Sequence, residues 1–228
     1  MKLLAVDTST EACSAALSIN GEVIERFEIA PRKHAELILP MIDSLLNEAG
    51  CVLSQMDAIA FGRGPGAFTG VRIGTGVVQG LAFSIDRPVV PVSSLAAMAY
   101  GAMAAFNTDN VLTGIDARMG EIYWGVYQRA ASGGVVLLGE ESVCKPDEAF
   151  VPPASGNWIG VGTAWKAYNE LLTARYAGLL GESHSDQFPR TRDIAALGVI
   201  AYEAGQAVSA EEAQPVYLRN NVAVKKAR

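Results

Sequence analysis

The chain has 228 residues, of which 50% are hydrophobic and 18% are charged. A chain of this length exceeds one small domain and buries roughly 70–75% of its unfolded surface, so a substantial core is expected. The net charge of −6 would repel phosphate backbones, which argues against tRNA or DNA binding by this chain alone.

The charged fraction is low for a soluble surface, where about 25% is typical. Two explanations are open: a tightly packed Ala- and Gly-rich chain, or apolar surface that another chain covers. The basic cluster Lys225, Lys226 and Arg228 is interpreted as a solvated tail, with a weak contact to RNA as the alternative.

The three cysteines, Cys13, Cys51 and Cys144, lie in apolar runs without a Cys-x-x-Cys pair. This pattern favours buried thiols in a reducing compartment and neither a disulfide framework nor a zinc site. Asp7 interrupts the N-terminal apolar run too early for a signal peptide. No run of about 18 apolar residues is present, so we expect a cytoplasmic chain without a membrane span.

The first elements are predicted to be three strands, over residues 3–6, 12–19 and 22–29. Asn20-Gly21 separates the second strand from the third, and Asn-Gly between apolar runs is a strong hairpin signal. We therefore expect an antiparallel meander.

A helix is predicted from His34 to Ala49, because its apolar residues follow the 3.6-residue period and Gly50 suits the C-terminal cap. Pro40 should either kink this helix or mark its first turn. Leu39 widens the apolar face beyond what one packing seam needs.

A strand at 57–62 precedes a glycine-rich segment, 62–70, and a helix over 69–85. The segment lacks the Gly-Lys-Ser/Thr of a Walker A loop. A packing role is favoured over anion binding at the helix start. The helix contains four glycines, each unfavourable by about 1 kcal/mol relative to Ala, which predicts close approach of another backbone.

The remaining elements complete two α/β halves, divided at residues 1–107 and 108–228, with the last helix and tail able to pack back on the first half. The predicted strands are 88–92, 111–115, 121–128, 135–144 and 159–161. The predicted helices are 94–106, 163–173 and 193–208, followed by an extended segment at 214–219.

Two strand ends carry polar loops that could meet a nucleotide. Asp7, Thr8, Ser9 and Thr10 follow the first strand, and Asp116-Ala117-Arg118-Met119-Gly120 follows the strand at 111–115. The first loop has no glycine to let backbone N–H groups approach phosphate, and the second has one, at its end. Plain turn chemistry is favoured for the first loop and a hairpin turn is the alternative for the second, where Arg118 could contact a phosphate directly or pair with an acid of a partner.

No metal site is expected. The two histidines, His34 and His184, lie far apart in sequence, and no carboxylate cluster has ligand spacing. His34 is interpreted as a capping or surface residue.

These motifs resemble the TsaB (YeaZ) family. The resemblance rests on Asp7–Thr10, His34–Leu37 with Leu39-Pro40, Gly64–Gly74, Asp116–Met119 with Glu121–Tyr123, and Pro215–Arg219. It covers most of residues 1–129 and the tail, and Gly64–Gly74 is its most specific part.

The resemblance implies an α/β fold of the ASKHA (actin/Hsp70/sugar-kinase) class and a non-catalytic role in making threonylcarbamoyladenosine beside the anticodon of tRNA. It implies pairing with the catalytic paralogue TsaD through the two N-terminal helices, self-association as a homodimer, a link to the ATPase TsaE, and tRNA contact only through the complex. It implies no cofactor of its own, with ATP or ADP at the complex interface. The nucleotide-proximal residues would be Asp7, Thr8, Ser9, Thr10, Asp116 and Arg118. The partner-contact residues would be His34, Leu37, Ile38, Met41, Leu45, Arg72, Gly74, Val77 and Val78.

Two other interpretations remain open. The chain could be a stand-alone ATPase, kinase or peptidase of the same fold, which the glycine-poor loops argue against. It could also be a structural homodimer with a different partner.

Overall fold

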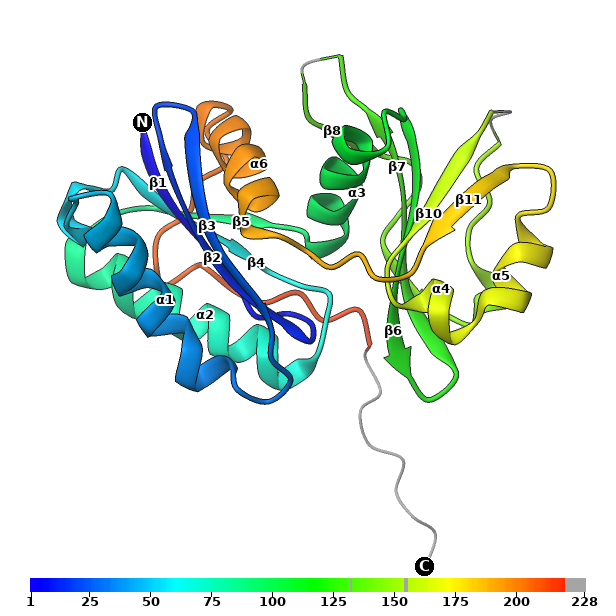
Figure 1. Cartoon of the computed structure of the whole chain (residues 1–228), viewed down its shortest axis with the longest axis horizontal. Coiled ribbons are helices and arrows are strands. Elements are labelled where there is room, and N and C mark those ends of the chain that lie inside the picture. Colours follow the sequence, from blue (N-terminus) through cyan, green and yellow to red (C-terminus); the bar gives the residue numbers. More distant parts are fainter. Residues whose placement is uncertain (132, 154–155, 220–228) are drawn as a thin grey trace, which may run out of the picture.

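Two β-sheets, each flanked by helices, form the framework of the chain in a computed structural model (Figure 1). The structure describes residues 1–131, 133–153 and 156–219. The basic cluster Lys225, Lys226 and Arg228 lies outside the described residues.

The first sheet contains the predicted meander and two strands parallel to its first member. Its order is β3 (Glu22–Ile29), β2 (Ala12–Ile19), β1 (Lys2–Asp7), β4 (Ala58–Gly62) and β5 (Val89–Val92). β1, β2 and β3 pair antiparallel, whereas β4 and β5 run parallel to β1. Asn20 and Gly21 both have positive φ, as the predicted hairpin requires. The meander is confirmed.

The second sheet repeats this topology. Its order is β11 (Leu180–His184), β10 (Trp158–Val161), β6 (Asn110–Arg118), β7 (Glu121–Arg129) and β8 (Val135–Leu137), and β9 (Ser142–Cys144) also pairs with β7. β6 and β7 are antiparallel, while β10 and β11 run parallel to β6. The expectation of two similar α/β halves is confirmed.

The single strand predicted over 135–144 is wrong. β8 and β9 pair separately with β7, and between them the chain turns at Gly139, where φ is +75°. β11 was not predicted, because its sequence Leu-Gly-Glu-Ser-His lacks apolar alternation.

The helices form layers on the sheets (Figure 1). α1 (His34–Glu48) and α2 (Phe68–Ile85) cover one face of the first sheet, and α6 (Thr191–Glu203) packs on the other. α3 (Ser94–Ala105) lies between the two sheets, and α4 (Ala164–Ala167) and α5 (Asn169–Arg175) lie beyond the second. Two short single-turn helices, Leu53–Gln55 and Pro146–Glu148, complete the set.

Some predicted helix bounds are corrected. The helix expected at 163–173 is broken at Tyr168, whose φ of −134° and ψ of 35° leave the helical region. α6 begins at Thr191 rather than 193. α1 continues through Pro40, so this proline does not mark its first turn.

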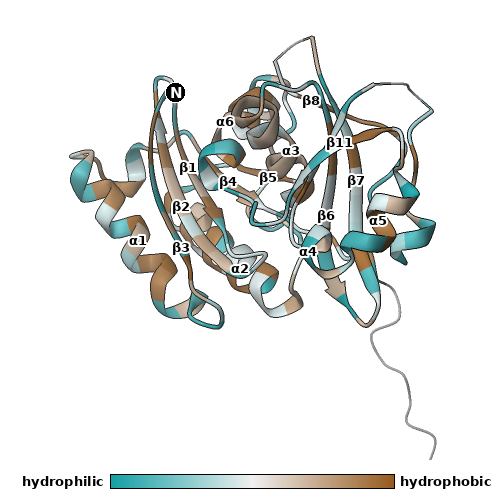
Figure 2. Ribbon diagram, turned by 45° about the vertical axis from the view of Figure 1, so that its right-hand side comes forward, coloured by the Kyte–Doolittle hydropathy of each residue, from teal (hydrophilic) through white to brown (hydrophobic). Residues whose placement is uncertain are grey.

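The cores follow the layers. Aliphatic residues fill the space between α1, α2 and the first sheet, and Trp124, Trp165 and Tyr176 pack together on the outer side of the second sheet. Figure 2 shows hydrophobic residues along the strands of both sheets and also on α1. Of the three free cysteines only Cys13 is buried, whereas Cys51 and Cys144 are half-buried, contrary to the expectation of buried thiols.

The chain returns to the first sheet after α6. Val208 forms a bridge with Val89, Ala213 is buried in the core beneath α2, and the Val216 N–H donates to the Arg63 carbonyl oxygen at 2.8 Å. The division at residues 107 and 108 stays a prediction. Across the described ranges, no helix is both long and apolar enough to cross a membrane.

Candidate functional site: the cleft between the halves and the outer face of α1 and α2

A cleft of about 240 Å³ lies where the two polar loops meet. Both predicted loops contribute to it, together with the glycine-rich segment and the C-terminal segment. Its lining residues are Ser9, Thr10, Glu11, Gly66, Ala67, Phe68, Ile115, Asp116, Ala117, Arg118, Tyr123 and Arg219. Of the six predicted nucleotide-proximal residues, Ser9, Thr10, Asp116 and Arg118 therefore line one cleft.

Asp7 lies behind the cleft and is only 1% exposed. Its Oδ1 accepts hydrogen bonds from the Ser9 N–H at 3.1 Å and the Ser9 hydroxyl at 3.0 Å, while Oδ2 has no partner among the described residues. A Cβ at Gly62 would lie 1.7 Å from Oδ2, so only glycine fits there. Burial raises the pKa of the Asp7 carboxyl to about 7.

The glycine-rich segment covers the loop that follows β1. The Ala67 N–H donates to the Ser9 carbonyl oxygen at 2.7 Å. A Cβ at Gly66 would lie 2.2 Å from the Ser9 carbonyl oxygen, and one at Gly70 would lie 2.1 Å from the Thr8 carbonyl oxygen. The expected packing role of this segment is confirmed.

The second loop is a tight β-hairpin turn. Arg118, Met119 and Gly120 all have positive φ, and the Asp116 carboxylate accepts a hydrogen bond from the Arg118 N–H at 2.8 Å. The Arg118 guanidinium pairs with Asp116 at 2.8 Å and reaches across the cleft to Glu11 at 3.1 Å. This pair joins the two halves at the mouth of the cleft.

The described residues do not fit the nucleotide and magnesium that kinases of this fold class hold between their halves. The Asp7 carboxylate is enclosed, and the Ser9 N–H that could meet a phosphate donates to it instead. No group of three His, Cys, Asp or Glu side chains with metal-binding arrangement occurs in the part of the chain that the structure describes. Among the described residues that line the cleft, Arg118 and Arg219 are the two that attract anions.

The histidines have structural roles. His34 is buried, and its Nε2 lies 2.8 Å from the Thr10 carbonyl oxygen, so it fixes the start of α1 on the first loop. This placement corrects the interpretation of His34 as a capping or surface residue. His184 stacks on the ring of Phe106 at 3.8 Å.

Five of the predicted partner-contact residues are covered by the chain itself. Ile38, Leu45 and Val78 are fully buried in the core between α1, α2 and the first sheet. His34 is held by Thr10, and Gly74 packs against the Thr8 hydroxyl. These five residues are buried within the fold of the chain itself, and their direct contact with a partner stays a prediction. Leu37, Met41, Arg72 and Val77 are at least partly exposed and stay predictions.

The side of these two helices that faces solvent, which we call the outer face, carries a different set of residues. Phe83 is 74% exposed and Leu39 is 49% exposed. A Cβ at Gly76 or at Gly80 would meet nothing within 4 Å. Residues 72, 76, 80 and 83 follow helical spacing, so Arg72, Gly76, Gly80 and Phe83 share one side of α2. Phe83 was missed, although its spacing opposite the buried stripe could have indicated it.

Arg72 joins the outer face to the C-terminal segment. Its guanidinium lies 3.8 Å from the centre of the Phe68 ring, and its Nε donates to the Tyr217 hydroxyl at 2.8 Å. This cluster holds the segment that follows α6 against the start of α2.

The repeated five-strand topology, with α3 and α6 between the sheets and polar loops meeting in a cleft, defines an α/β protein of the ASKHA class. Residues 26–227 match a family model described as "TsaD: tRNA N6-adenosine threonylcarbamoyltransferase". The "tRNA threonylcarbamoyladenosine biosynthesis protein TsaB" of Escherichia coli (strain K12) is 44% identical over 230 residues, covering 99% of this chain and 98% of the relative. The chain belongs to the TsaB family.

Two further relatives support the same family assignment. The protein of the same name from Haemophilus influenzae is 44% identical over 234 residues, covering 99% of this chain and 97% of the relative. The solved structure "YeaZ from Pseudomonas aeruginosa" superposes with a TM-score of 0.89 at 47% identity, covering 95% of this chain and 99% of that chain.

Proposed function

We propose that this chain is a non-catalytic, cytoplasmic subunit in the synthesis of tRNA threonylcarbamoyladenosine, and that it binds and activates a TsaD-type subunit through the outer face of α1 and α2. Its relatives carry the name of that biosynthesis, and the family model that matches it is named for the transferase. TsaE and tRNA would be reached through the complex.

The observation that carries the docking proposal is the pair of open glycines beside an exposed phenylalanine. Gly70 and Gly74 are explained within the chain, because both pack against Thr8. Gly76 and Gly80 meet nothing, yet each weakens the helix by about 1 kcal/mol relative to Ala. A partner helix that approaches this bare backbone closely would offset that loss.

Exposed apolar side chains beside the glycines supply the driving force. Burying a Leu or Phe side chain contributes about 1.5–3 kcal/mol, and Phe83 and Leu39 are both available. The same face could pair with a second copy of this chain, so a homodimer is the competing state.

The cleft supports the non-catalytic part of the proposal. The loop after β1 is covered by the glycine-rich segment, and Asp7 is enclosed, so this loop offers no phosphate cradle. Arg118 and Arg219 could still contact the phosphates of ATP or ADP held at the interface of the complex.

The test is co-purification with TsaD using Gly76→Glu and Phe83→Glu. Both positions are open in the free chain, so the variants should fold, while a buried charge in the complex should abolish capture. Leu171→Glu is the matched control, because Leu171 is 50% exposed on α5, in the other half.

Sedimentation of each variant alone separates TsaD binding from self-association. Loss of capture by both variants, with unchanged melting temperature and unchanged capture of the control, supports the proposal. Full capture of both variants would reject this face as the docking site.

A stand-alone ATPase or kinase is the second candidate, favoured by the two arginines in the cleft. Calorimetry of the purified chain with ATP and magnesium decides it, since micromolar binding would support this candidate and absence of heat would reject it. A peptidase is not supported, because His34 bonds the Thr10 carbonyl oxygen, His184 stacks on Phe106, and neither histidine forms a hydrogen bond to a serine or cysteine among the described residues.

A further inference from the structure

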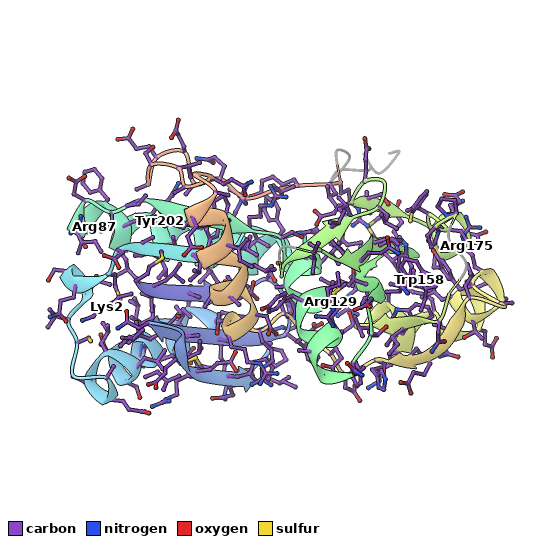
Figure 3. All side chains as sticks on the ribbon, turned by 90° about the horizontal axis from the view of Figure 1, so that it is seen from above. Lys2, Arg87, Arg129, Trp158, Arg175 and Tyr202 are labelled. Atoms are coloured by element: carbon purple, nitrogen blue, oxygen red, sulfur yellow. The ribbon has the colours of Figure 1, made fainter. Side chains whose placement is uncertain are left out.

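A second and larger cavity, of about 420 Å³, lies between the halves at a different place from the cleft. Figure 3 shows the two halves from above, with α6 on the first and Arg129, the last residue of β7, on the second. The cavity is lined by Arg63 and Ser93, which follow the parallel strands β4 and β5, by α6, and by β7 and β8 of the second sheet. The carboxyl ends of parallel strands are where open α/β sheets bind ligands, and the volume is within the roughly 300–1,000 Å³ typical of such sites.

Among the described residues that line this cavity, one group is positive, the Arg63 guanidinium. The backbone of Arg63 is held on both sides, since its N–H donates to Val92 and its carbonyl oxygen accepts from Val216, both at 2.8 Å. Its Nε is buried without a hydrogen-bond partner, and no carboxylate of the described residues lies within 4.0 Å of its charge. A guanidinium on an anchored backbone, without a carboxylate partner, is suited to bind an anionic group.

The same described lining contains one negative group, the Glu141 carboxylate. The hydroxyls of Ser93 and Tyr127 both donate to its Oε1. Oε2 receives no hydrogen bond from the described residues and therefore remains free to accept one. Ser93 is itself held at the start of α3, where its hydroxyl caps the Ala96 N–H. Two hydroxyl donors therefore orient the Glu141 carboxylate, and its second oxygen, Oε2, is available to a ligand.

Most of the remaining wall is apolar, and Ser93, Tyr127 and Gln206 add polar groups to it. Leu197 and Ile200 of α6 face Val135 and Leu137 of β8. Groups of opposite charge in a cavity that is otherwise largely apolar suit a ligand that carries both charges and an apolar part.

We propose that this cavity binds a small aliphatic zwitterion of the α-amino acid class, with its carboxylate on Arg63, its ammonium on Glu141 Oε2, and its side chain against Leu197, Ile200 and Val135. Water bridging Arg63 to Glu141 is the competing arrangement, and it predicts no saturable binding. The site is separate from the outer face, so the inference does not depend on docking to TsaD.

The experiment is calorimetric titration of the full chain with L-leucine, L-isoleucine and L-valine. Saturable binding of at least one of them is expected. The amide of that amino acid, which lacks the carboxylate, and the deaminated acid, which lacks the ammonium, should each bind about 10- to 100-fold more weakly, because each leaves one charged group of the site without its partner.

Two variants test which protein group binds the carboxylate of the amino acid and which binds its ammonium. Arg63→Gln should reduce affinity for the amino acid by a similar factor but leave the affinity for its amide unchanged. Glu141→Gln should reduce affinity for the amino acid but not for the deaminated acid. Arg87→Gln is the control, because Arg87 lies at the far end of the first half (Figure 3).

Thermal melts establish that each variant is folded. Arg63→Lys, which keeps the positive charge, is a second variant for the case in which Arg63→Gln does not fold, and should retain part of the affinity. Absence of saturable heat with all three amino acids would overturn the proposal, as would equal affinity for an amino acid and its deaminated acid.

Discussion

The hydroxyl of Thr8 donates a 2.6 Å hydrogen bond to the carbonyl oxygen of Gly70, and this contact fastens the first turn of α2 to the loop that follows β1. The bond is buried, and Gly74, one turn further along the helix, leaves room for the same hydroxyl. The loop that would meet phosphate in a kinase of this fold is here a packing element. The glycines of α2 therefore divide into two kinds, those that accommodate Thr8 and those that face outward.

Ala substitutions should distinguish the two kinds of glycine. Gly74→Ala would place a Cβ 2.7 Å from Thr8 Oγ1, so the hydroxyl must move and the free energy of unfolding should fall by about 1–3 kcal/mol. The Cβ that Gly76→Ala adds would contact nothing within 4 Å, so this variant should raise the free energy of unfolding by up to about 1 kcal/mol. Urea unfolding of both variants measures the difference. Equal destabilisation by both would contradict this division.

Asp7 should make stability fall as pH rises. Its pKa is raised by burial from 3.8 to about 7, so between these values the folded chain holds a proton that the unfolded chain has released. The contribution of Asp7 to the free energy of unfolding is therefore fully present below pH 3.8 and is lost as pH rises through about 7. The loss is on the order of 4 kcal/mol. Asp193, whose pKa is raised by burial to about 6, acts in the same direction.

The measurement is the unfolding free energy of Asp7→Asn relative to the wild type, from pH 4 to pH 8. The difference should shift in favour of the variant as pH rises, whatever its constant offset. Asp43→Asn, at an exposed position of α1, is the control. A difference independent of pH would show that Asp7 does not titrate in this range.

Glu25 should anchor α6 to the first sheet. Its carboxylate accepts hydrogen bonds from the Arg190 guanidinium at 2.6 and 3.0 Å and from the Arg192 N–H at 3.1 Å. Glu25→Gln removes the negative charge from the ion pair with Arg190 and from the start of α6. The free energy of unfolding should therefore fall by about 2–3 kcal/mol. Glu28→Gln, exposed on the same strand, should change little. Chemical unfolding compares the two, and similar losses would mean that Glu25 has no special role.

The contact between Arg118 and Glu11 should be weak and sensitive to salt. Arg118 is 72% exposed, and exposed ion pairs contribute about 0–1 kcal/mol. A double-mutant cycle with Arg118→Gln and Glu11→Gln should give a coupling energy of a few tenths of a kcal/mol that disappears at high ionic strength. A larger coupling that persists in salt would show that this pair clamps the halves together.

Local patterns were sufficient for much of the fold. The meander was predictable because Asn20-Gly21 and the apolar runs act over a few residues, and α1 was predictable because its apolar residues follow the 3.6-residue period. The edge strand β11 was not predictable, since its pairing with β10 rather than its own pattern makes it a strand.

The sequence by itself determined the order of most elements and the lack of glycine in the loop after β1, because these depend on neighbouring residues, and the ASKHA-type frame followed from the resemblance of its motifs to a known family. Only the tertiary structure decided that Ile38, Leu45 and Val78 face the chain's own core while Leu39 and Phe83 face outward. It also brought Arg63 and Glu141 to one cavity. Burial is a property of how distant segments pack, and no local pattern states which of two apolar faces finds a partner within the same chain.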